Sequence, residues 1–480
     1  MPSRIETKIY GEHFTPVDIF QKFIFPYIKD RIYDHIWVDL FAGEGNLILP
    51  ILNTIPTKER IDFFIENIFL FDIQEKNVYK AIEKAQTYGI PEDIAKEKII
   101  QKDTLKDYPQ QLLKTNKKVF HITNPPYLYL GHIPKNKETQ KYLEYFRNEN
   151  KGYQDLYQIA MINDLRAKIQ EMIYIIPTNF LFGYSVANKI RKDFLRFYKI
   201  LKAFIFEENI FETTGQNVMI CFFSRKDIPK NEKVEFNGIK IKDGEWVQKR
   251  FVLLPENNYR AGGVFEEFVK NYKAPQPLSI KFYLTINELK SNTGSFKVRL
   301  VDANNFKENN RYQVLEVGVD EKMCKKIKSN DLFLRTLDTG GVQGRVGLYS
   351  ITEVFEADGI VVTKEKHRTH PIQVFIEPPL TQEEQKILKN YFNMLLEYFR
   401  KETDSDFLTT YKYSSSPYTR KYLGLKQSKA LIETLPLKSM NQTEINTLKT
   451  LINQKKIHEV LTYIKTKNKE KTSRNLYLFV

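Results

Sequence analysis

The stretch HITNPPYLYL, residues 121 to 130, holds the residues of this sequence best suited to chemistry. Asn124, Pro125, Pro126 and Tyr127 follow directly after an apolar run that reads as a buried strand. The Asn124 amide oxygen and a main-chain carbonyl, that of Pro125, can accept both hydrogens of a planar amino group and direct its lone pair at an electrophile. The prolines stiffen the loop, and Tyr127 offers a flat face for a planar substrate. The pattern predicts a site that activates a planar NH₂ group, with a simple proline turn as the alternative.

Acidic residues follow three successive apolar runs upstream of this stretch. Asp39 precedes Gly43 and Gly45 in VDLFAGEGN, Asp72 lies in LFDIQEKN, and Asp103 lies in QKDTL. The two glycines let the backbone approach a ligand closely at the start of a helix. Asp72 could grip ribose hydroxyls, and Asp103 could accept a hydrogen bond from an adenine amino group. Since the third glycine of a G-x-G-x-x-G motif is missing, the set suits S-adenosylmethionine better than NAD. Acids that only cap strand ends or helix starts are the alternative.

The elements that must position these residues alternate between short apolar runs and amphipathic helical patterns. This rhythm predicts an α/β domain with a mainly parallel sheet, covered on both faces. Ligands of such sheets bind at the carboxyl ends of the strands, where the candidate residues fall. The apolar runs span residues 35–41, 67–73, 96–103, 118–123, 172–177, 202–207 and 217–223, and the helical patterns span 74–88, 155–170 and 184–198.

The rhythm is lost near residue 235, which predicts a domain boundary there. Shorter strand-like pieces and clusters of Gly, Asn and Lys follow, and a helical pattern closes the chain from about residue 441. The sequence therefore predicts an α/β domain over 1–235, a mixed α+β domain over 236–440 and a helical segment over 441–480.

Composition and charge restrict the class of protein. Only Cys221 and Cys324 occur, so one chain can build neither a disulfide framework nor a thiolate zinc site, and we expect no metal. No apolar run approaches the roughly 20 residues of a membrane span, and no signal peptide is visible, so we expect a cytoplasmic protein without membrane attachment. The net charge is +15, and the last 80 residues hold 15 Lys and Arg against 7 Asp and Glu. That excess favours a polyanionic partner.

With these residues in view, the chain resembles the N6-adenine DNA methyltransferases of restriction–modification systems. It is similar to their gamma class, the TaqI and Eco57I-like group, motif by motif over residues 8 to 225. The resemblance implies a Rossmann-like, S-adenosylmethionine-dependent methyltransferase domain with a seven-stranded mixed sheet, followed by a target-recognition domain. It also implies site-specific N6-methylation of adenine in double-stranded DNA, with S-adenosyl-L-methionine as donor and S-adenosylhomocysteine as product. The target adenine would be flipped out of the duplex, because its amino group is unreachable inside.

The motifs of this family carry over residue by residue. YGEHFTP supplies Thr15 for the methionine end of the cofactor, and IFETTGQNVMICFF supplies Phe211 as a second face opposite Tyr127. DLYQIA ends in Ala160 where the family commonly has Phe. The resemblance assigns catalysis to Asn124, Pro125, Pro126, Tyr127 and Phe211, and cofactor binding to Thr15, Asp39, Phe41, Ala42, Gly43, Gly45, Asp72, Ile73, Asp103, Thr104 and Asn124.

The second half resembles a target-recognition domain less specifically. DTGGVQGRVG either presents Arg345 to a DNA groove or forms a surface hairpin turn. The stretch 411–429 mixes hydroxyls, tyrosines and basic residues, a composition suited to phosphate and base contacts, although a solvated loop has the same composition. The candidate DNA-binding residues are Arg345, Tyr411, Lys412, Arg420 and Lys421.

Other classes of function remain open on the sequence. Methyltransferases that act on a glutamine of release factors, or on an RNA amino group, also use a planar NH₂ acceptor. A non-catalytic DNA-binding subunit would keep the fold without the reaction. We expect a monomer that acts on DNA beside a separately encoded restriction endonuclease.

Overall fold

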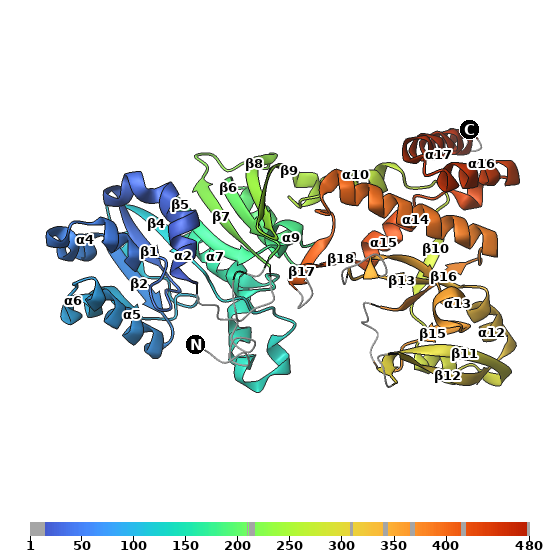
Figure 1. Ribbon diagram of the computed structural model, residues 1–480, viewed down its shortest axis with the longest axis horizontal. Coiled ribbons are helices and arrows are strands. Elements are labelled where there is room, and N and C mark those ends of the chain that lie inside the picture. The colour runs from blue at the N-terminus through green and yellow to red at the C-terminus, as the bar shows by residue number, and fades with distance from the viewer. Residues whose placement is uncertain are drawn as a thin grey trace. The chain divides into compact units, whose positions relative to one another are not determined.

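The apolar runs of the first half form one mixed sheet in the computed structural model of the chain (Figure 1). Its nine strands lie in the order β3-β2-β1-β4-β5-β7-β6-β8-β9. The strands from β3 to β5 pair in parallel, whereas β7 is antiparallel to both β5 and β6. This arrangement confirms the predicted α/β domain with a mixed sheet. The strands are β1 (His35–Asp39), β2 (Ile68–Asp72), β3 (Ile99–Gln101), β4 (Lys118–Thr123), β5 (Glu171–Pro177), β6 (Tyr198–Phe206), β7 (Val218–Arg225), β8 (Val234–Lys242) and β9 (Glu245–Leu253).

The structure describes part of the chain: residues 15–208, 210, 217–307, 311–338, 344–364, 370–413 and 419–477, without the side chains of 411–413 and 469–477. The chain divides into two compact units. The first comprises Met1–Ala261 and Thr410–Thr419, and the second comprises Gly262–Thr409 and Arg420–Val480.

Helices cover the sheet of the first unit according to their patterns of apolar residues. The helix α5 buries Asn77, Ala81 and Ala85 along one side and exposes the other, as an amphipathic helix does. The helix α7 is buried almost all round, from Leu156 to Ile162, because it packs between the sheet and neighbouring segments. The helices are α2 (Val17–Ile19), α3 (Phe25–Ile28), α4 (Arg60–Asn67), α5 (Glu75–Thr87), α6 (Glu92–Lys98), α7 (Leu156–Arg166), α8 (Asn179–Phe182) and α9 (Asn188–Leu195).

The first unit continues beyond the boundary expected near residue 235, which falls inside β8. This strand pairs in parallel with β6, from Lys202 opposite Asn237 to Phe206 opposite Ile241, and β9 pairs antiparallel with β8. Phe236 and Leu253 are buried in the core of the first unit. The change from apolar runs to Lys- and Asn-rich sequence therefore marks two strands with one solvent-facing side rather than the end of the sheet.

The second unit is a mixed α+β structure, as expected, with sheets of strand order β10-β16-β13-β14 and β12-β11-β15. The first of these sheets shares its apolar core with a long helix, α14. A capping box of Thr381 and Glu384 starts this helix. The strands are β10 (Ser279–Phe282), β11 (Thr293–Phe306), β12 (Tyr312–Val319), β13 (Leu332–Arg335), β14 (Gly347–Ser350), β15 (Gly359–Val361) and β16 (Ile372–Glu377). The hairpin strands β17 (Thr409–Tyr413) and β18 (Thr419–Tyr422) are divided between the units, since Thr410–Thr419 belongs to the first unit. The helices are α10 (Gly263–Asn271), α11 (Ile286–Lys290), α12 (Glu321–Lys328), α13 (Ile351–Phe355), α14 (Gln382–Thr403), α15 (Leu425–Ile432), α16 (Gln442–Asn453) and α17 (Ile457–Tyr477).

The expected C-terminal helical segment forms α16 and α17, but these helices are not separate from the second unit. Leu448 and Val460 are fully buried in the same apolar core as Leu395 of α14. Of the helices that the structure describes, none has the length and apolar composition needed to cross a bilayer.

The pairing of β8 with β6 leads to a prediction about truncated chains. A chain ending at residue 235 exposes the edge of β6, whereas a chain ending at residue 261 keeps β8 and β9 on that edge. We expect the shorter chain to unfold at least about 5 °C lower and to aggregate more readily, since an apolar strand edge is exposed. Thermal melts of the two chains, purified side by side, check this. Equal midpoints would show that β8 contributes nothing to the sheet.

Candidate functional site

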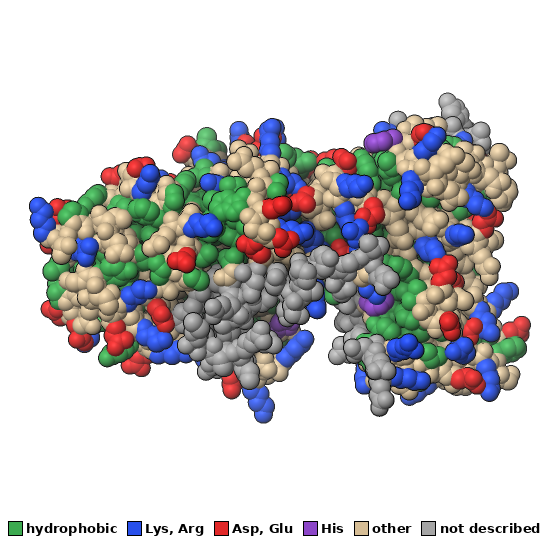
Figure 2. Space-filling model, viewed as in Figure 1, with side chains coloured by type: hydrophobic (Ala, Val, Ile, Leu, Met, Phe, Trp, Pro, Cys, Tyr) green, Lys and Arg blue, Asp and Glu red, His purple; other side chains and the backbone are tan. Residues whose placement is uncertain are grey.

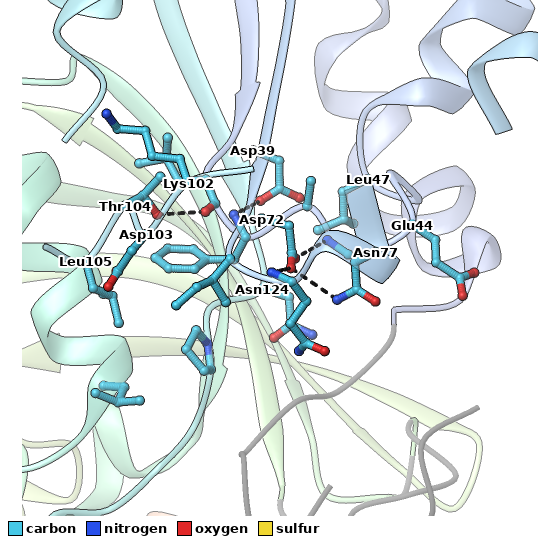
Figure 3. A pocket seen from close by; sticks show the side chains of 18 of the residues that line it. Asp39, Glu44, Leu47, Asp72, Asn77, Lys102, Asp103, Thr104, Leu105 and Asn124 are labelled. Carbon is cyan, nitrogen blue, oxygen red and sulfur yellow. Dashed lines mark hydrogen bonds between the residues drawn. The ribbon is translucent and has the colours of Figure 1, made fainter. Parts of the chain in front are cut away.

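The carboxyl ends of β1, β2 and β4 meet at one edge of the sheet, where a cavity lies (Figure 3). Asp39 ends β1, Asp72 ends β2, and Asn124 directly follows β4. Because parallel neighbouring strands end side by side, residues far apart in sequence converge there. The cavity is lined by Thr15, Asp39, Leu40, Phe41, Ala42, Gly43, Glu44, Asn46, Leu47, Asp72, Ile73, Gln74, Asn77, Lys102, Asp103, Thr104, Leu105, Asn124, Pro126, Tyr142, Tyr145 and Leu156.

The Asp39 carboxyl is buried and ties the two central loops of the site together. Its Oδ1 accepts hydrogen bonds from the Phe41 N–H at 2.9 Å and from the Thr123 hydroxyl at 2.6 Å. Its Oδ2 is buried without a hydrogen-bond partner among the described residues. Burial raises the pKa of Asp39 to about 6, against the lowering effect of the Thr123 hydrogen bond. Asp39 therefore fixes the backbone of the loop after β1 through its hydrogen bond with the Phe41 N–H.

Asp72 holds the glycine loop in place. Its Oδ2 accepts from the Gly43 N–H at 2.9 Å, and its Oδ1 accepts from the Gln74 N–H at 2.8 Å and the Asn77 side chain at 3.1 Å (Figure 3). Burial raises the pKa of Asp72, and these hydrogen bonds oppose that rise. Ile73, which follows, lines the cavity and is 48% exposed. Asp72 is thus both a cavity wall and the anchor of the backbone beside it.

Gly45 lies behind the loop, outside the set of described residues that line the cavity. Its φ is +79°, and a Cβ there would lie 2.6 Å from a methyl group of Leu49. The α-helix expected to start near Leu47 is instead a 3₁₀ helix, Leu49–Thr54, with Pro50 in its first turn. Gly45 is therefore needed for the turn and for close packing, while Gly43 brings the backbone to the cavity.

An aromatic wall faces Asp103 on the far side of the cavity. The Tyr145 hydroxyl donates to Asp103 Oδ2 at 2.5 Å, and the rings of Tyr142 and Tyr145 stack with centroids 6.0 Å apart. Burial, together with the hydrogen bond to Asp103, raises the pKa of Tyr145. Thr104 donates to the Leu40 carbonyl at 2.8 Å, which joins this segment to the end of β1. The sequence motifs missed both tyrosines, whose only signal was the aromatic-rich stretch KYLEYF.

The Asn124 side chain is oriented by two neighbours. Its Nδ2 donates to the Thr15 hydroxyl at 3.0 Å, and its Oδ1 accepts from the Tyr127 hydroxyl, which also lies 2.7 Å from the Ile175 carbonyl. Pro126 lines the cavity, while Pro125 is buried beneath it. Since an amide oxygen carries two lone pairs, the bond from Tyr127 leaves Oδ1 able to accept a second donor.

Two aromatic candidates for base binding are placed differently. The Tyr127 ring is 6% exposed and is absent from the described lining of the cavity; it packs edge-on against Tyr157. Burial raises the pKa of its hydroxyl well above the usual range. Phe211 lies outside the described residues.

The structure does not bring the DNA-binding candidates into one cluster that can be described. Arg345 forms an ion pair with Glu397 at 2.6 Å through one guanidinium nitrogen, and its side chain is 43% exposed. Arg420 and Lys421 are partly buried, and the side chains of Tyr411 and Lys412 lie outside the described ones. On the face that Figure 2 shows, described Lys and Arg side chains lie among acidic ones rather than in one patch.

Comparisons with known proteins add to this geometry. A sequence model of the family described as N-6 DNA Methylase matches residues 3–309. Among curated proteins, no sequence matches this chain. Similar solved structures include a type I restriction-modification methyltransferase subunit from Streptococcus thermophilus (17% identity, 54% of this chain and 58% of that chain, TM-score 0.36) and the type IIG restriction endonuclease BpuSI (12%, 92% and 61%, 0.38). A third is the M protein of the type I restriction enzyme EcoKI (14%, 66% and 65%, 0.35). The chain thus spans between 58% and 65% of the length of these proteins.

The buried carboxyl of Asp39 leads to a prediction about pH and stability. Since its pKa rises from 3.8 to about 6 on folding, the folded chain binds more protons in that window, and stability falls as pH rises through it. Asp39→Asn keeps an acceptor oxygen but does not titrate. Between pH 4.5 and 7.5 we expect the wild type to lose on the order of 2 kcal/mol more stability than this variant.

Urea denaturation at a series of pH values measures this difference. Asp155, whose pKa burial raises to about 7, contributes equally to both chains and cancels. Parallel stability curves would contradict the assigned state of Asp39.

Proposed function

Because this chain belongs to the N-6 DNA methylase family, we propose that it transfers a methyl group from S-adenosylmethionine to the N6 amino group of adenine in DNA. One observation carries the proposal beyond family membership. Asn124 stands at the rim of the same cavity that Asp39, Asp72 and Asp103 line, so the acceptor loop and a nucleoside-sized site share one edge of the sheet.

The residues present suit the cofactor. Apolar side chains of Leu105 and Leu156 with the Tyr145 ring would hold the adenine, with Asp103 as acceptor for its amino group. Asp72 and Gln74 would bind the ribose hydroxyls, because carboxylate and amide groups are strong partners for hydroxyls. S-adenosylmethionine supplies an electrophilic methyl group when bound.

The methionine end would lie toward the glycine loop. Thr15 is 6% exposed, and its main-chain carbonyl accepts from Asn46 at 2.8 Å, so the segment before α2 is fixed beside the loop. Phe41, Ala42 and Gly43 form the floor there. The buried Asp39 Oδ2, without a partner among the described residues, offers a fixed negative charge nearby as pH rises.

Asn124 performs the step that needs geometry rather than covalent chemistry. An adenine amino group is a poor nucleophile because its lone pair is delocalised into the ring. Accepting its hydrogens at Asn124 Oδ1 and at the Pro125 carbonyl pulls the nitrogen toward a tetrahedral shape and turns its lone pair toward the methyl carbon. The Thr15 and Tyr127 contacts fix the orientation of the amide before substrate arrives.

Tyr127 is proposed to act in two ways. Its hydroxyl orients Asn124, and its ring becomes one face for the extruded base once the loop adjusts on DNA binding. The second face remains assigned to Phe211 on the resemblance of its motif. The adjustment is required because the ring is buried in the free chain.

Recognition of a particular sequence is proposed for the second unit, with a double-stranded DNA partner and a separately encoded nuclease. A monomer suffices for this division of work, and a cytoplasmic location is proposed with it. Modification of a protein glutamine or an RNA amino group is less favoured, since the matching family acts on DNA.

One experiment tests the function. Unmodified genomic DNA is treated with the chain and S-adenosylmethionine, and modified adenines are mapped by single-molecule sequencing. N6-methyladenine within one recurring sequence supports the proposal. If labelled methyl groups appear on added protein or RNA while the DNA stays unmodified, methylation of that protein or RNA replaces the proposal.

We expect Asn124→Ala to abolish methyl transfer while leaving cofactor affinity nearly unchanged. The substitution removes a hydrogen-bond acceptor that is used in the transition state. Thr15, which the Asn124 side chain contacts, lies on a different element of the chain and is not changed by the substitution. Single-turnover assays and calorimetry measure the two properties. A residual rate above about a tenth of the wild-type rate means that less than roughly 1.4 kcal/mol of transition-state stabilisation is lost. That result would contradict the role assigned to Asn124.

The Tyr145 hydroxyl should matter separately from its ring. Tyr145→Phe loses the hydrogen bond to Asp103 and keeps the aromatic wall, so we expect S-adenosylmethionine to bind about threefold to tenfold more weakly. Tyr145→Leu loses both and should bind more weakly still. Calorimetry ranks the three chains. Unchanged affinity in both variants would place the adenine elsewhere.

A further inference from the structure

A short stretch from late in the chain belongs to the first unit. The chain leaves the second unit after Thr409, contributes Thr410–Thr419 to the first unit, and returns to the second unit at Arg420. Thr419, at the end of this stretch, is 8% exposed. Its hydroxyl donates to the Glu207 carbonyl at 2.7 Å and accepts from the Asn217 side chain at 3.2 Å. The Thr419 hydroxyl therefore acts once as a donor and once as an acceptor, toward two residues that lie about 200 positions earlier in the sequence.

These two residues are the fixed ends of the connection from β6 to β7. Glu207 directly follows β6, and its carboxylate forms a buried ion pair with Lys240 at 3.1 Å. Asn217 directly precedes β7 and donates to the Phe206 carbonyl at 2.9 Å. Since a buried ion pair and buried amide contacts require good geometry, both ends have little freedom to shift. Thr419 bridges them.

The same edge of the sheet leads from Asn217 to the catalytic loop. The Asn217 carbonyl accepts from the Thr178 N–H at 3.1 Å, directly after β5. Within β5, the Ile175 carbonyl lies 2.7 Å from the Tyr127 hydroxyl, whose single hydrogen is shared between this carbonyl and Asn124 Oδ1. Thr178 is 1% exposed, so this part of the path is dry. A path of hydrogen bonds and covalent backbone through Asn217 and β5 thus runs from Thr419 to the side chain that would accept the target amino group.

We propose that Thr419 is a positioning residue for methyl transfer, which holds β5 and β7 in the register that orients Tyr127 and Asn124. The inference rests on the proposed function, because it assigns Thr419 a part in that reaction. It also implies that a residue carried by the late part of the sequence sets the geometry of the early catalytic loop. Spatial continuity alone does not prove coupling, so the test must measure coupling directly.

Three substitutions in the full chain separate the hydroxyl from packing. Thr419→Val keeps the shape and removes the hydroxyl, and Thr419→Ser keeps the hydroxyl and removes a methyl group. Thr410→Val is the matched control, because Thr410 is a 3% exposed threonine of the same hairpin, and no hydrogen bond between its hydroxyl and Glu207 or Asn217 is found in the described part of the chain. We expect Thr419→Val to lower kcat on duplex DNA about tenfold with cofactor affinity within about twofold of wild type. Thr419→Ser should keep kcat within about threefold, and Thr410→Val should match the wild type.

A double-mutant cycle tests whether the effect passes through Tyr127. If it does, Thr419→Val combined with Tyr127→Phe should be no slower than the slower single variant, since both remove the same orientation of Asn124. Fully multiplicative losses would overturn the path. If Thr419→Val does not fold, Thr419→Ala compared with Thr419→Ser gives the same contrast.

The outcomes also separate this inference from the proposed function. A wild-type chain that does not methylate DNA overturns both. An active wild type with an equally active Thr419→Val overturns only the role of Thr419. Equal losses in the Val and Ser variants, or a matching loss of cofactor affinity, would show that Thr419 contributes only packing.

Discussion

The buried carboxyl of Asp39 is the interaction on which the arrangement of the site depends. It joins the loop after β1, through the Phe41 N–H, to the end of β4, through the Thr123 hydroxyl. Because β1 and β4 are paired neighbours, their ends are separated by one strand spacing, and Asn124 comes one residue after Thr123. The glycine-loop side and the Asn124 side of the cavity are therefore held together by one side chain. Burial raises the pKa of Asp39, although the hydrogen bond from Thr123 opposes that rise.

A second buried network supports the same two strands from below. The Leu40 N–H donates to His121 Nε2 at 3.2 Å, and His121 Nδ1 contacts the Asp164 carboxylate on α7. Accepting at Nε2 requires that the His121 proton sits on Nδ1, which faces Asp164. Tyr108 and Tyr174 donate to the same carboxylate at 2.9 and 2.6 Å. A fully bonded polar group in a core specifies one packing arrangement, which explains how α7 can be buried almost all round and still hold one position.

Local sequence was enough to predict the strands β1 to β7 and the convergence of Asp39, Asp72 and Asn124, because β-branched runs define strands and parallel strands end at a common edge. It missed β8 and β9, which extend the expected seven-stranded sheet to nine strands. It could not predict the contact of Tyr145 with Asp103, since the segment between them has no periodic pattern. The segment after the glycine loop forms a 3₁₀ helix, Leu49–Thr54, instead of the expected α-helix, and a Cβ at Gly45 would meet the Leu49 side chain of that helix. The contact of Thr419 with residues 207 and 217 joins positions about 200 residues apart, which no local pattern encodes.

The path of the chain through residues 410–419 has a consequence for how such genes can recombine. The two units are joined by three peptide crossings, near residues 261, 409 and 419, instead of one. Recombination at the first junction alone would combine the sheet of one parent with the hairpin of the other. The contacts of Thr419 with Glu207 and Asn217 would then join residues from two different parents. The second unit could be exchanged without disturbing this bridge only if residues 410–419 stayed with the first unit. Exchange of the second unit between relatives of this chain is therefore constrained by the ten residues 410–419, which lie far in the sequence from the junction near residue 261.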